Sequence, residues 1–263
     1  MTKPDHPAFL RPAKVVWLLL LGLLVYALVL LFTVPAGWLW QRFSPHVSLP
    51  PQVQVGSVSG QVWQGAAAIT AYNHPLHLTW DLQMPSLTEL SLPVRFTVNT
   101  VSSGLQGEAV LAWPGQARLS ADGSVRVREF EQLIRRSGGA LLAGDIDVER
   151  LSVGWADGRL TEARGLARWP GGEVTWPMGN RMESANFPPM EAVLNDADQH
   201  LSLAISQAGQ SEPAAQADIF ADGMLELKVY KRLVDLAGQN WSAAARPGDV
   251  IFRVRQPLLP GAG

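Results

Sequence analysis

The chain of 263 residues contains no cysteine and few charged residues. Without thiols it cannot form disulfides, thiolate zinc sites or iron–sulfur clusters, and it has no cysteine nucleophile. Only 17% of its residues are charged, against about 25% in an average soluble domain. A net charge of −2 argues against a nucleic-acid partner, which requires a basic surface. We expect no cofactor, no metal ion and no nucleic acid.

The few charges are distributed unevenly. The first 42 residues contain one acidic side chain, Asp5, and four basic ones: Lys3, Arg11, Lys14 and Arg42. This segment therefore carries a net charge of +3, which leaves −5 for the rest of the chain within the total of −2. A basic start before an acidic body is typical of a protein anchored in a membrane by its N-terminus.

Residues 15–34 form an uncharged apolar run. At about 1.5 Å per residue a helix of this length spans the roughly 30 Å hydrocarbon core of a bilayer. Trp38 and Trp40 follow where aromatic rings prefer the interface. The run predicts a single transmembrane helix, with residues 1–14 in the cytoplasm and residues 35–50 as an interfacial linker. The positive-inside rule places the following body on the opposite, non-cytoplasmic side of the membrane.

A cleaved signal peptide is the alternative. The small residues around Ala36, after Val34 and Pro35, resemble a cleavage site. The apolar run is longer than the roughly 7–15 residues of a signal peptide, however, and proline makes the site a poor substrate. The anchor is therefore favoured, and both interpretations export the body.

The body has the period of two residues that is typical of strands. Apolar and polar residues alternate over 76–82, 94–99, 201–206 and 225–229. Gly, Pro and Asp-Gly interrupt these runs at short intervals, which favours an antiparallel sheet. The predicted fold is mainly β, with a few short helices, one of them after Pro85 because residues 86–89 read as a capping box. We divide it into β-rich halves at 51–140 and 141–256, with a tail at 257–263.

An internal duplication relates the two halves. Residues 116–138 and 216–238 align without a gap, and seven of the 23 positions are identical. Asp122 and Gly123 in the first copy, and Asp222 and Gly223 in the second, predict hairpin turns. An apolar helical stripe follows each turn, and Gly138 is expected to cap the first helix. Chance similarity of two amphipathic hairpins is the alternative.

No arrangement of side chains indicates catalysis. His74 and His77 lack the third ligand that a metal site requires. Asp145, Asp147 and Glu149 alternate along one strand, and we interpret them as a solvated strand edge, since acidic edges discourage pairing. We therefore expect no enzyme and no catalytic, cofactor-binding or metal-binding residues.

The tryptophans of the body leave two interpretations open. They could fill the core and the corners of the sheet, or they could form an exposed aromatic patch for a partner or a lipid. The seven residues concerned are Trp63, Trp80, Trp113, Trp155, Trp169, Trp176 and Trp241.

A Val-Ser-Gly-x-x-Trp-x-Gly stretch carries a family resemblance. Its characteristic residues are Gly60, Trp63 and Gly65, and it follows a Pro-Ala-Gly-Trp sequence at residues 35–38. This order of features resembles protein N of the bacterial type II secretion system. The resemblance implies a single-pass inner-membrane protein without enzymatic activity, which assists export of folded exoproteins across the outer membrane. Its implied partners are the inner membrane and other secretion components. We interpret the three motif residues as fold-defining, because glycine permits close backbone approach.

An AsmA-like module that binds lipid or another hydrophobic ligand is the alternative function. The two functions predict different surroundings for six apolar side chains: Leu76, Leu78, Trp80, Val94, Phe96 and Val98. An open, continuous apolar groove would favour lipid, whereas a face closed on itself or under a helix would favour a scaffold.

Overall fold

The computed structural model describes residues 12–47, 49, 52–86, 88–136, 139–157, 159–197, 200–220 and 222–257. Helices α1 (Pro12–Thr33) and α2 (Ala36–Phe43) come first, followed by the 3-10 turn η1 (Ser44–His46). Within these ranges no helix has both the length and the hydropathy needed to cross a membrane. Residues 1–11 of the predicted cytoplasmic segment, Gly138 and nearly all of the predicted tail lie outside the described ranges.

Two antiparallel sheets make up the body. The larger one contains thirteen strands, and the smaller one contains β11, β10 and β7 in that order. The strands of the larger sheet are β1 (Val53–Gly60), β2 (Gln64–Ala71), β3 (His74–Leu82), β4 (Ser91–Asn99), β5 (Gly104–Ala112), β6 (Gln116–Arg126), β8 (Asp145–Ala156), β9 (Arg159–Trp169), β12 (Met190–Ala197), β13 (His200–Gln207), β14 (Ala215–Ile219), β15 (Met224–Tyr230) and β16 (Val250–Pro257). Those of the smaller sheet are β7 (Leu141–Leu142), β10 (Gly172–Met178) and β11 (Arg181–Phe187). The mainly β, antiparallel fold that the alternation predicts is confirmed.

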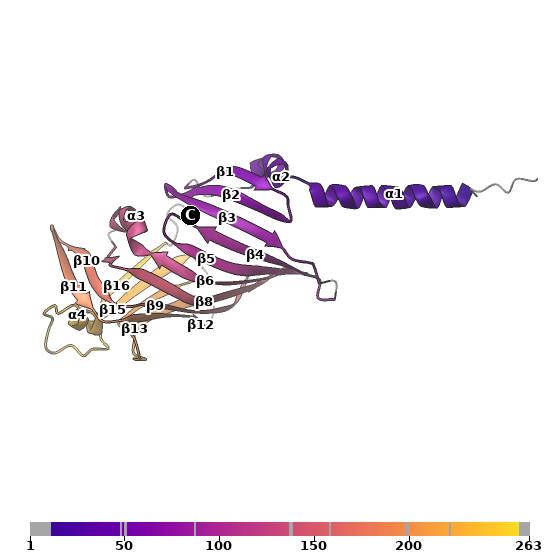
Figure 1. The fold of residues 1–263 in the computed structure, drawn as a ribbon. Coiled ribbons are helices and arrows are strands. Elements are labelled where there is room, and N and C mark those ends of the chain that lie inside the picture. Colours follow the sequence, from indigo (N-terminus) through magenta and orange to yellow (C-terminus); the bar gives the residue numbers. More distant parts are fainter. Residues whose placement is uncertain are drawn as a thin grey trace, which may run out of the picture.

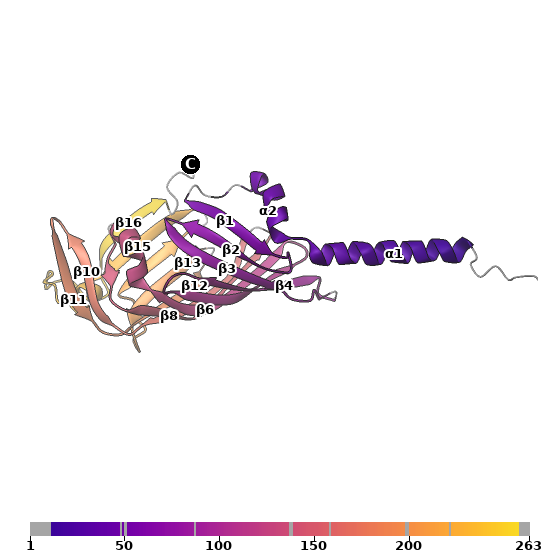
Figure 2. The ribbon, with the colours of Figure 1, turned by 45° about the horizontal axis from the view of Figure 1, so that its top comes forward.

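The larger sheet is strongly curved. A twist of roughly 20° per strand accumulates over thirteen strands, so that β1–β4 lie on one side and β15 and β16 on the other (Figures 1 and 2). Helix α1 projects from one end of the body, and β10 and β11 lie at the opposite end (Figure 1). The strands of the larger sheet follow one another in chain order, with only β7, β10 and β11 left out.

The strand register gives the larger sheet one apolar face. Residues directly opposite each other on antiparallel strands lie on the same face. One line of such pairs crosses all thirteen strands and contains only apolar residues. We call it the apolar row: Val58, Ala67, Leu78, Val98, Leu105, Gly123, Val148, Ala167, Ala192, Ile205, Ala215, Val229 and Phe252.

The opposite face carries a matching line of polar residues. It runs from β3 to β16, and we call it the polar row: Asp81, Arg95, Glu108, Ser120, Ser152, Arg164, Asn195, Ser202, Asp218, Glu226 and Arg255. Because the side-chain period of a strand is two, a register slip of one residue would move the apolar side chains of a strand to the polar face and its polar side chains to the apolar face. The two rows therefore specify the register of the whole sheet.

The duplicated segments differ in structure before their helices. In the second copy, Asp222 and Gly223 lie in the connection between β14 and β15. In the first copy the expected turn is wrong, because Asp122 and Gly123 lie inside β6 and form a bulge opposite β8. Strand β5 pairs with β6 as far as Ser124, so the chain continues straight where the second copy turns. Gly123 has φ +151°, a conformation that glycine alone adopts readily.

The helices of the two copies do correspond. Each copy ends in a six-residue helix, α3 (Glu131–Arg136) or α4 (Lys231–Leu236), at positions that differ by 100. The 3-10 turn η2 (Val127–Phe130) leads into α3, whereas β15 leads directly into α4. The structures of the two segments are therefore more alike at the junction of strand and helix than in the hairpin.

Two further expectations are wrong. No helix follows Pro85 in the described residues, because Ser86 and Ser91 exchange backbone hydrogen bonds of 2.9 and 3.1 Å and close a short turn between β3 and β4. The acidic residues of β8 do not form a strand edge, because β8 is paired on both sides, with β6 and β9. Asp145 instead forms an ion pair with Arg126 at 3.2 Å.

A cluster of buried apolar side chains lies at the end of the body that carries the smaller sheet. It consists of Trp169, Val174, Met190 and Ala214, with half-buried side chains from both sheets and from α4 around them. The smaller sheet and α4 thus form a second layer over the larger sheet at this end of the body.

Glu129 in η2 fixes the connection between β4 and β5. Its carboxylate accepts hydrogen bonds from the Thr100 hydroxyl at 2.5 Å, the Ser103 hydroxyl at 2.7 Å and the Val101 amide at 2.9 Å. Burial by itself raises the pKa of Glu129, but these hydrogen bonds together hold it below its usual value.

Glu129→Ala is therefore expected to destabilise the protein by about 1.5–3 kcal/mol, the usual range for hydrogen bonds to a charged group. Chemical denaturation would measure this change. Glu131→Ala is the control, because it removes only an exposed i,i+4 pair with Arg135 and should cost less than about 0.5 kcal/mol. Equal stabilities of the two variants would contradict the assigned role of Glu129.

Candidate functional site

The family motif forms a tight turn between β1 and β2. Gly60 has φ +84°, and the Gln61 amide donates to the Gln64 carbonyl at 2.8 Å. A Cβ atom on Gly60 would lie 2.6 Å from the same carbonyl oxygen. Positive φ and close approach both require glycine at this position.

Gly65 leaves space for an aromatic ring from β3. A Cβ atom at Gly65 would overlap the Trp80 ring and would lie 2.7 Å from the Ser59 carbonyl oxygen. The Trp80 indole donates to the Val62 carbonyl at 2.9 Å. Trp63 lies in the turn itself, where its carbonyl accepts from the Leu82 amide at 2.7 Å. The ring packed over this turn is therefore Trp80.

The predicted site residues do not form a common site. Gly60, Trp63 and Gly65 lie at β1 and β2, whereas Asp122 and Gly123 lie in β6 and are separated from them by β3–β5. At the third location, the Met224 amide donates to the Asp222 carboxylate at 3.0 Å, and Gly223 has φ +77°. Each set shapes the backbone locally.

Metal-binding clusters are absent from the residues that the structure describes: no group of three or more His, Asp or Glu side chains is suitably placed. Of the histidine pair, His74 lies 5.3 Å from the Phe130 ring, measured between ring centroids. His77 is exposed.

A buried polar cluster surrounds Asp218 on the polar row. This carboxylate is only 2% exposed and accepts hydrogen bonds from Lys228 at 2.8 Å, Ser202 at 2.7 Å and Gln216 at 2.8 Å. Burial by itself raises the pKa of Asp218, but these hydrogen bonds and the lysine charge together hold it below its usual value. The hydrogen bond to the carboxylate likewise raises the pKa of Lys228. Because the carboxylate is fully paired, the cluster is suited to stability rather than to chemistry.

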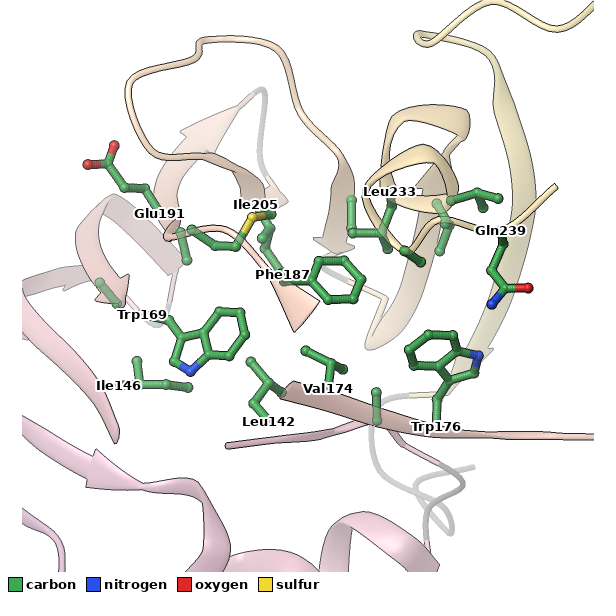
Figure 3. Close-up of a pocket in the computed structure, with 18 of the residues that line it drawn as sticks. Leu142, Ile146, Trp169, Val174, Trp176, Phe187, Glu191, Ile205, Leu233 and Gln239 are labelled. Carbon is green, nitrogen blue, oxygen red and sulfur yellow. The ribbon is translucent and has the colours of Figure 1, made fainter. Parts of the chain in front are cut away.

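A cavity of about 550 Å³ lies between the two sheets and α4. The apolar row provides one wall, through Ala167, Ala192, Ile205, Ala215 and Val229. The smaller sheet and α4 provide the other walls, and Figure 3 shows their side chains around the cavity: Leu142, Val174, Trp176, Phe187 and Leu233.

The indole of Trp169 and the carboxylate of Glu191, two of the polar groups near the cavity, are already paired within the chain. The Trp169 indole donates to the Ala143 carbonyl at 2.7 Å. The Glu191 carboxylate points away from the apolar side chains (Figure 3) and accepts from Arg168 at 3.1 Å. Among the described residues, every buried side-chain nitrogen or oxygen has a hydrogen-bond partner. The cavity therefore offers hydrophobic contact and few directional hydrogen bonds.

Some tryptophans of the body are buried in the core and others are exposed, so each of the two interpretations of the sequence holds for part of the set. Trp169 is 5% exposed and belongs to the core, and Trp80 and Trp176 are half-buried. Trp113 and Trp241, by contrast, are 76% and 53% exposed. Sequence reasoning missed the cavity, although three of the tryptophans that it singled out, Trp169, Trp176 and Trp241, line it.

The six side chains that distinguish the two candidate functions lie on the apolar face. Leu78 pairs with Val98, and Trp80 pairs with Phe96. All six are half-buried, and none is fully buried. Since Leu78 and Val98 belong to the apolar row, this face continues across the sheet to the wall of the cavity.

Comparison with protein families agrees with the resemblance seen in the sequence. The family model for type II secretion system protein N matches residues 51–248, which is most of the chain. The chain belongs to the type II secretion system protein N family. As a protein N family member it takes part in type II secretion, and the matched region runs from the start of the body to the loop before β16. No curated protein and no solved structure matches this member of the family.

Proposed function

We propose that this protein N is an inner-membrane component of the type II secretion system that assists export of folded exoproteins from the periplasm across the outer membrane. The family match over residues 51–248 is the observation that carries the proposal. Its role is to bind other components of the apparatus and not to catalyse a reaction.

An N-terminal anchor is part of this proposal. Residues 15–34 contain no charge, and α1 covers nearly all of them. The large apolar side chains of α1 whose exposure the structure describes are exposed, among them Trp17 at 72% and Leu19 at 69%, which suits a lipid environment. The basic residues before this segment favour a cytoplasmic N-terminus and a periplasmic body.

Contacts of the segment after α1 with β1 position the sheet relative to the proposed anchor. Ala36 in α2 is buried, and Gly37 lies so close to β1 that a Cβ atom would be 2.7 Å from the Val58 carbonyl oxygen. The Val62 amide donates to the Val34 carbonyl at 3.2 Å. The predicted linker at 35–50 thus includes a docked helix, which supports a fixed orientation of the body relative to the anchor.

The opposite edge of the sheet is the surface that we propose for partners. Among the described strands, β16 pairs only with β15, and Phe252 on β16 is exposed. An unpaired strand edge can accept a strand from another protein. Helix α2 packs beside β1, so β16 is the more accessible edge.

Deleting the gene is expected to lower the amount of exoprotein outside the cell, and the full-length chain should restore it. Immunoblots of the culture medium and the periplasm would measure both effects. The same strain expressing an epitope-tagged full-length chain, treated with a cross-linker, should yield complexes with other secretion components. Normal secretion in the deletion strain, together with no cross-linked secretion component, would contradict the proposal. Gly248→Ala, at a position with open space around it, is the control variant that should complement fully.

A further inference from the structure

The cavity beside α4 is too large and too apolar to be an ordinary packing defect. Protein interiors are close-packed, and voids larger than one water molecule are few. A volume of about 550 Å³ instead lies within the roughly 300–1,000 Å³ that is typical of small-ligand sites. Sites of this size that are lined mainly by apolar side chains typically bind small apolar ligands.

The surrounding charges favour a hydrocarbon ligand over a charged one. Among the described residues that line the cavity, Arg168 is the one cation, and it is shared between Glu149 and Glu191. It is therefore already neutralised. Because the indole of Trp169 is also paired within the chain, a polar ligand would lose its hydrogen bonds to water without replacing them.

The rim of the cavity combines apolar and neutral polar groups. Met178 and Trp241 are more than half exposed and lie at the cavity. Gln239 and Asn240 add uncharged amides, which can hydrogen-bond to an ester, a hydroxyl or a carboxyl group. Figure 3 shows Gln239 beside Trp176, at the side of α4.

We propose that this cavity binds one acyl chain of a lipid or fatty acid, with its polar end at Gln239 and Asn240. The chain lies against the apolar row at Ala192 and Ile205 and is covered by the smaller sheet at Val174 and Phe187. This binding site is separate from the edge strand β16, and it does not depend on the proposed role in secretion.

Photo-cross-linking of the full chain in its own cells tests the site. A p-benzoylphenylalanine residue at Phe187 should, on irradiation, give a covalent adduct with the mass of an acyl-containing molecule. The same residue at Asn195, an exposed member of the polar row on β12, should give none. The mass of the adduct distinguishes a phospholipid from a free fatty acid.

A second variant tests whether the cavity itself holds the chain. Ala192→Phe places a ring against the cavity wall and should lower the adduct at residue 187 by roughly tenfold or more, because the filled space excludes the ligand. Asn195→Phe, on the same strand and the opposite face, should leave the yield unchanged. The melting temperature of each variant confirms that it is folded.

Three results would overturn the inference: no adduct at residue 187 in a folded protein, an adduct with a polypeptide instead of a lipid, or equal yields from the two phenylalanine variants. Secretion in the deletion strain is measured independently. Failure of the acyl-chain site therefore leaves the proposed function intact, and failure of the proposed function leaves the site intact.

Discussion

Asp218→Ala is expected to destabilise the protein by about 1.5–3 kcal/mol, the usual range for hydrogen bonds to a charged group. It removes the main partner of the half-buried ammonium group of Lys228, which keeps its ion pair with Glu226 at 3.1 Å. The removed carboxylate lies 2.8 Å from that ammonium group and is only 2% exposed. Chemical denaturation of the full chain in detergent would measure the loss. Asp235→Ala is the control, because Asp235 forms an exposed i,i+4 pair with Lys231 and should contribute less than about 0.5 kcal/mol.

The pH dependence of this effect has a definite sign. The pKa of Asp218 is lower in the folded protein than in the unfolded chain, so as pH falls the unfolded chain binds the proton first. The stabilisation is complete above the unfolded value of about 3.9 and is lost as pH falls toward the folded pKa. The difference between wild type and Asp218→Ala should therefore be constant from pH 7 to pH 5 and decrease below about pH 4. A difference that grew on acidification would contradict the pairing.

Gly65→Ala is expected to lower the free energy of unfolding by about 2–3 kcal/mol. This is the upper part of the range of about 1–3 kcal/mol that overpacking typically costs, because the added methyl group meets both a ring and a backbone oxygen. The added methyl group would overlap the Trp80 ring and approach the Ser59 carbonyl oxygen to 2.7 Å. For a body of this size the melting temperature should fall by roughly 4–12 °C. Gly248→Ala, at a position where nothing lies within 4 Å of an added Cβ atom, should change stability by less than about 0.5 kcal/mol.

A double variant identifies the cause of that loss. If the indole ring is the obstacle, Trp80→Leu should make a subsequent Gly65→Ala substitution less costly than it is in the wild type. Equal costs in both backgrounds would assign the loss to the backbone of β1. A neutral Gly65→Ala variant would show that the close approach of β1, β2 and β3 is not needed at this position.

Strand prediction succeeded where the information is local. Alternation over 76–82 and 94–99 fixes which side chains share a face, and the structure pairs Trp80 with Phe96 on that face. The same alternation relates the paired residues of neighbouring strands in the larger sheet. The mainly β fold therefore follows from a side-chain period of two.

Features that depend on distant segments were not accessible to the same reasoning. The same Asp-Gly dipeptide forms a turn at Gly223 and a bulge at Gly123, because the length of the neighbouring strand β5 decides the outcome. The cavity is assembled from nine separate strands, one helix and the segment that follows this helix. No local sequence pattern therefore identifies Trp176 or Phe187 as part of its walls. The helix predicted from the capping box at Ser86 failed for a similar reason. Ser86 pairs with Ser91 and closes a turn where the helix was expected.

The chain-order arrangement of the larger sheet has a consequence for folding during synthesis. Each strand finds its partner a few residues earlier, except where β7 and then β10 and β11 intervene before β8 and β12. Contacts that are close in sequence form quickly, because little loop-closure entropy opposes them. The sheet can therefore grow from β1 onward as the chain emerges, with α2 in place beside its first strand. Pairing of β12 with β9 is the step that must wait for a longer segment. The wall of the cavity is complete only when β13, β14, β15 and α4 have followed.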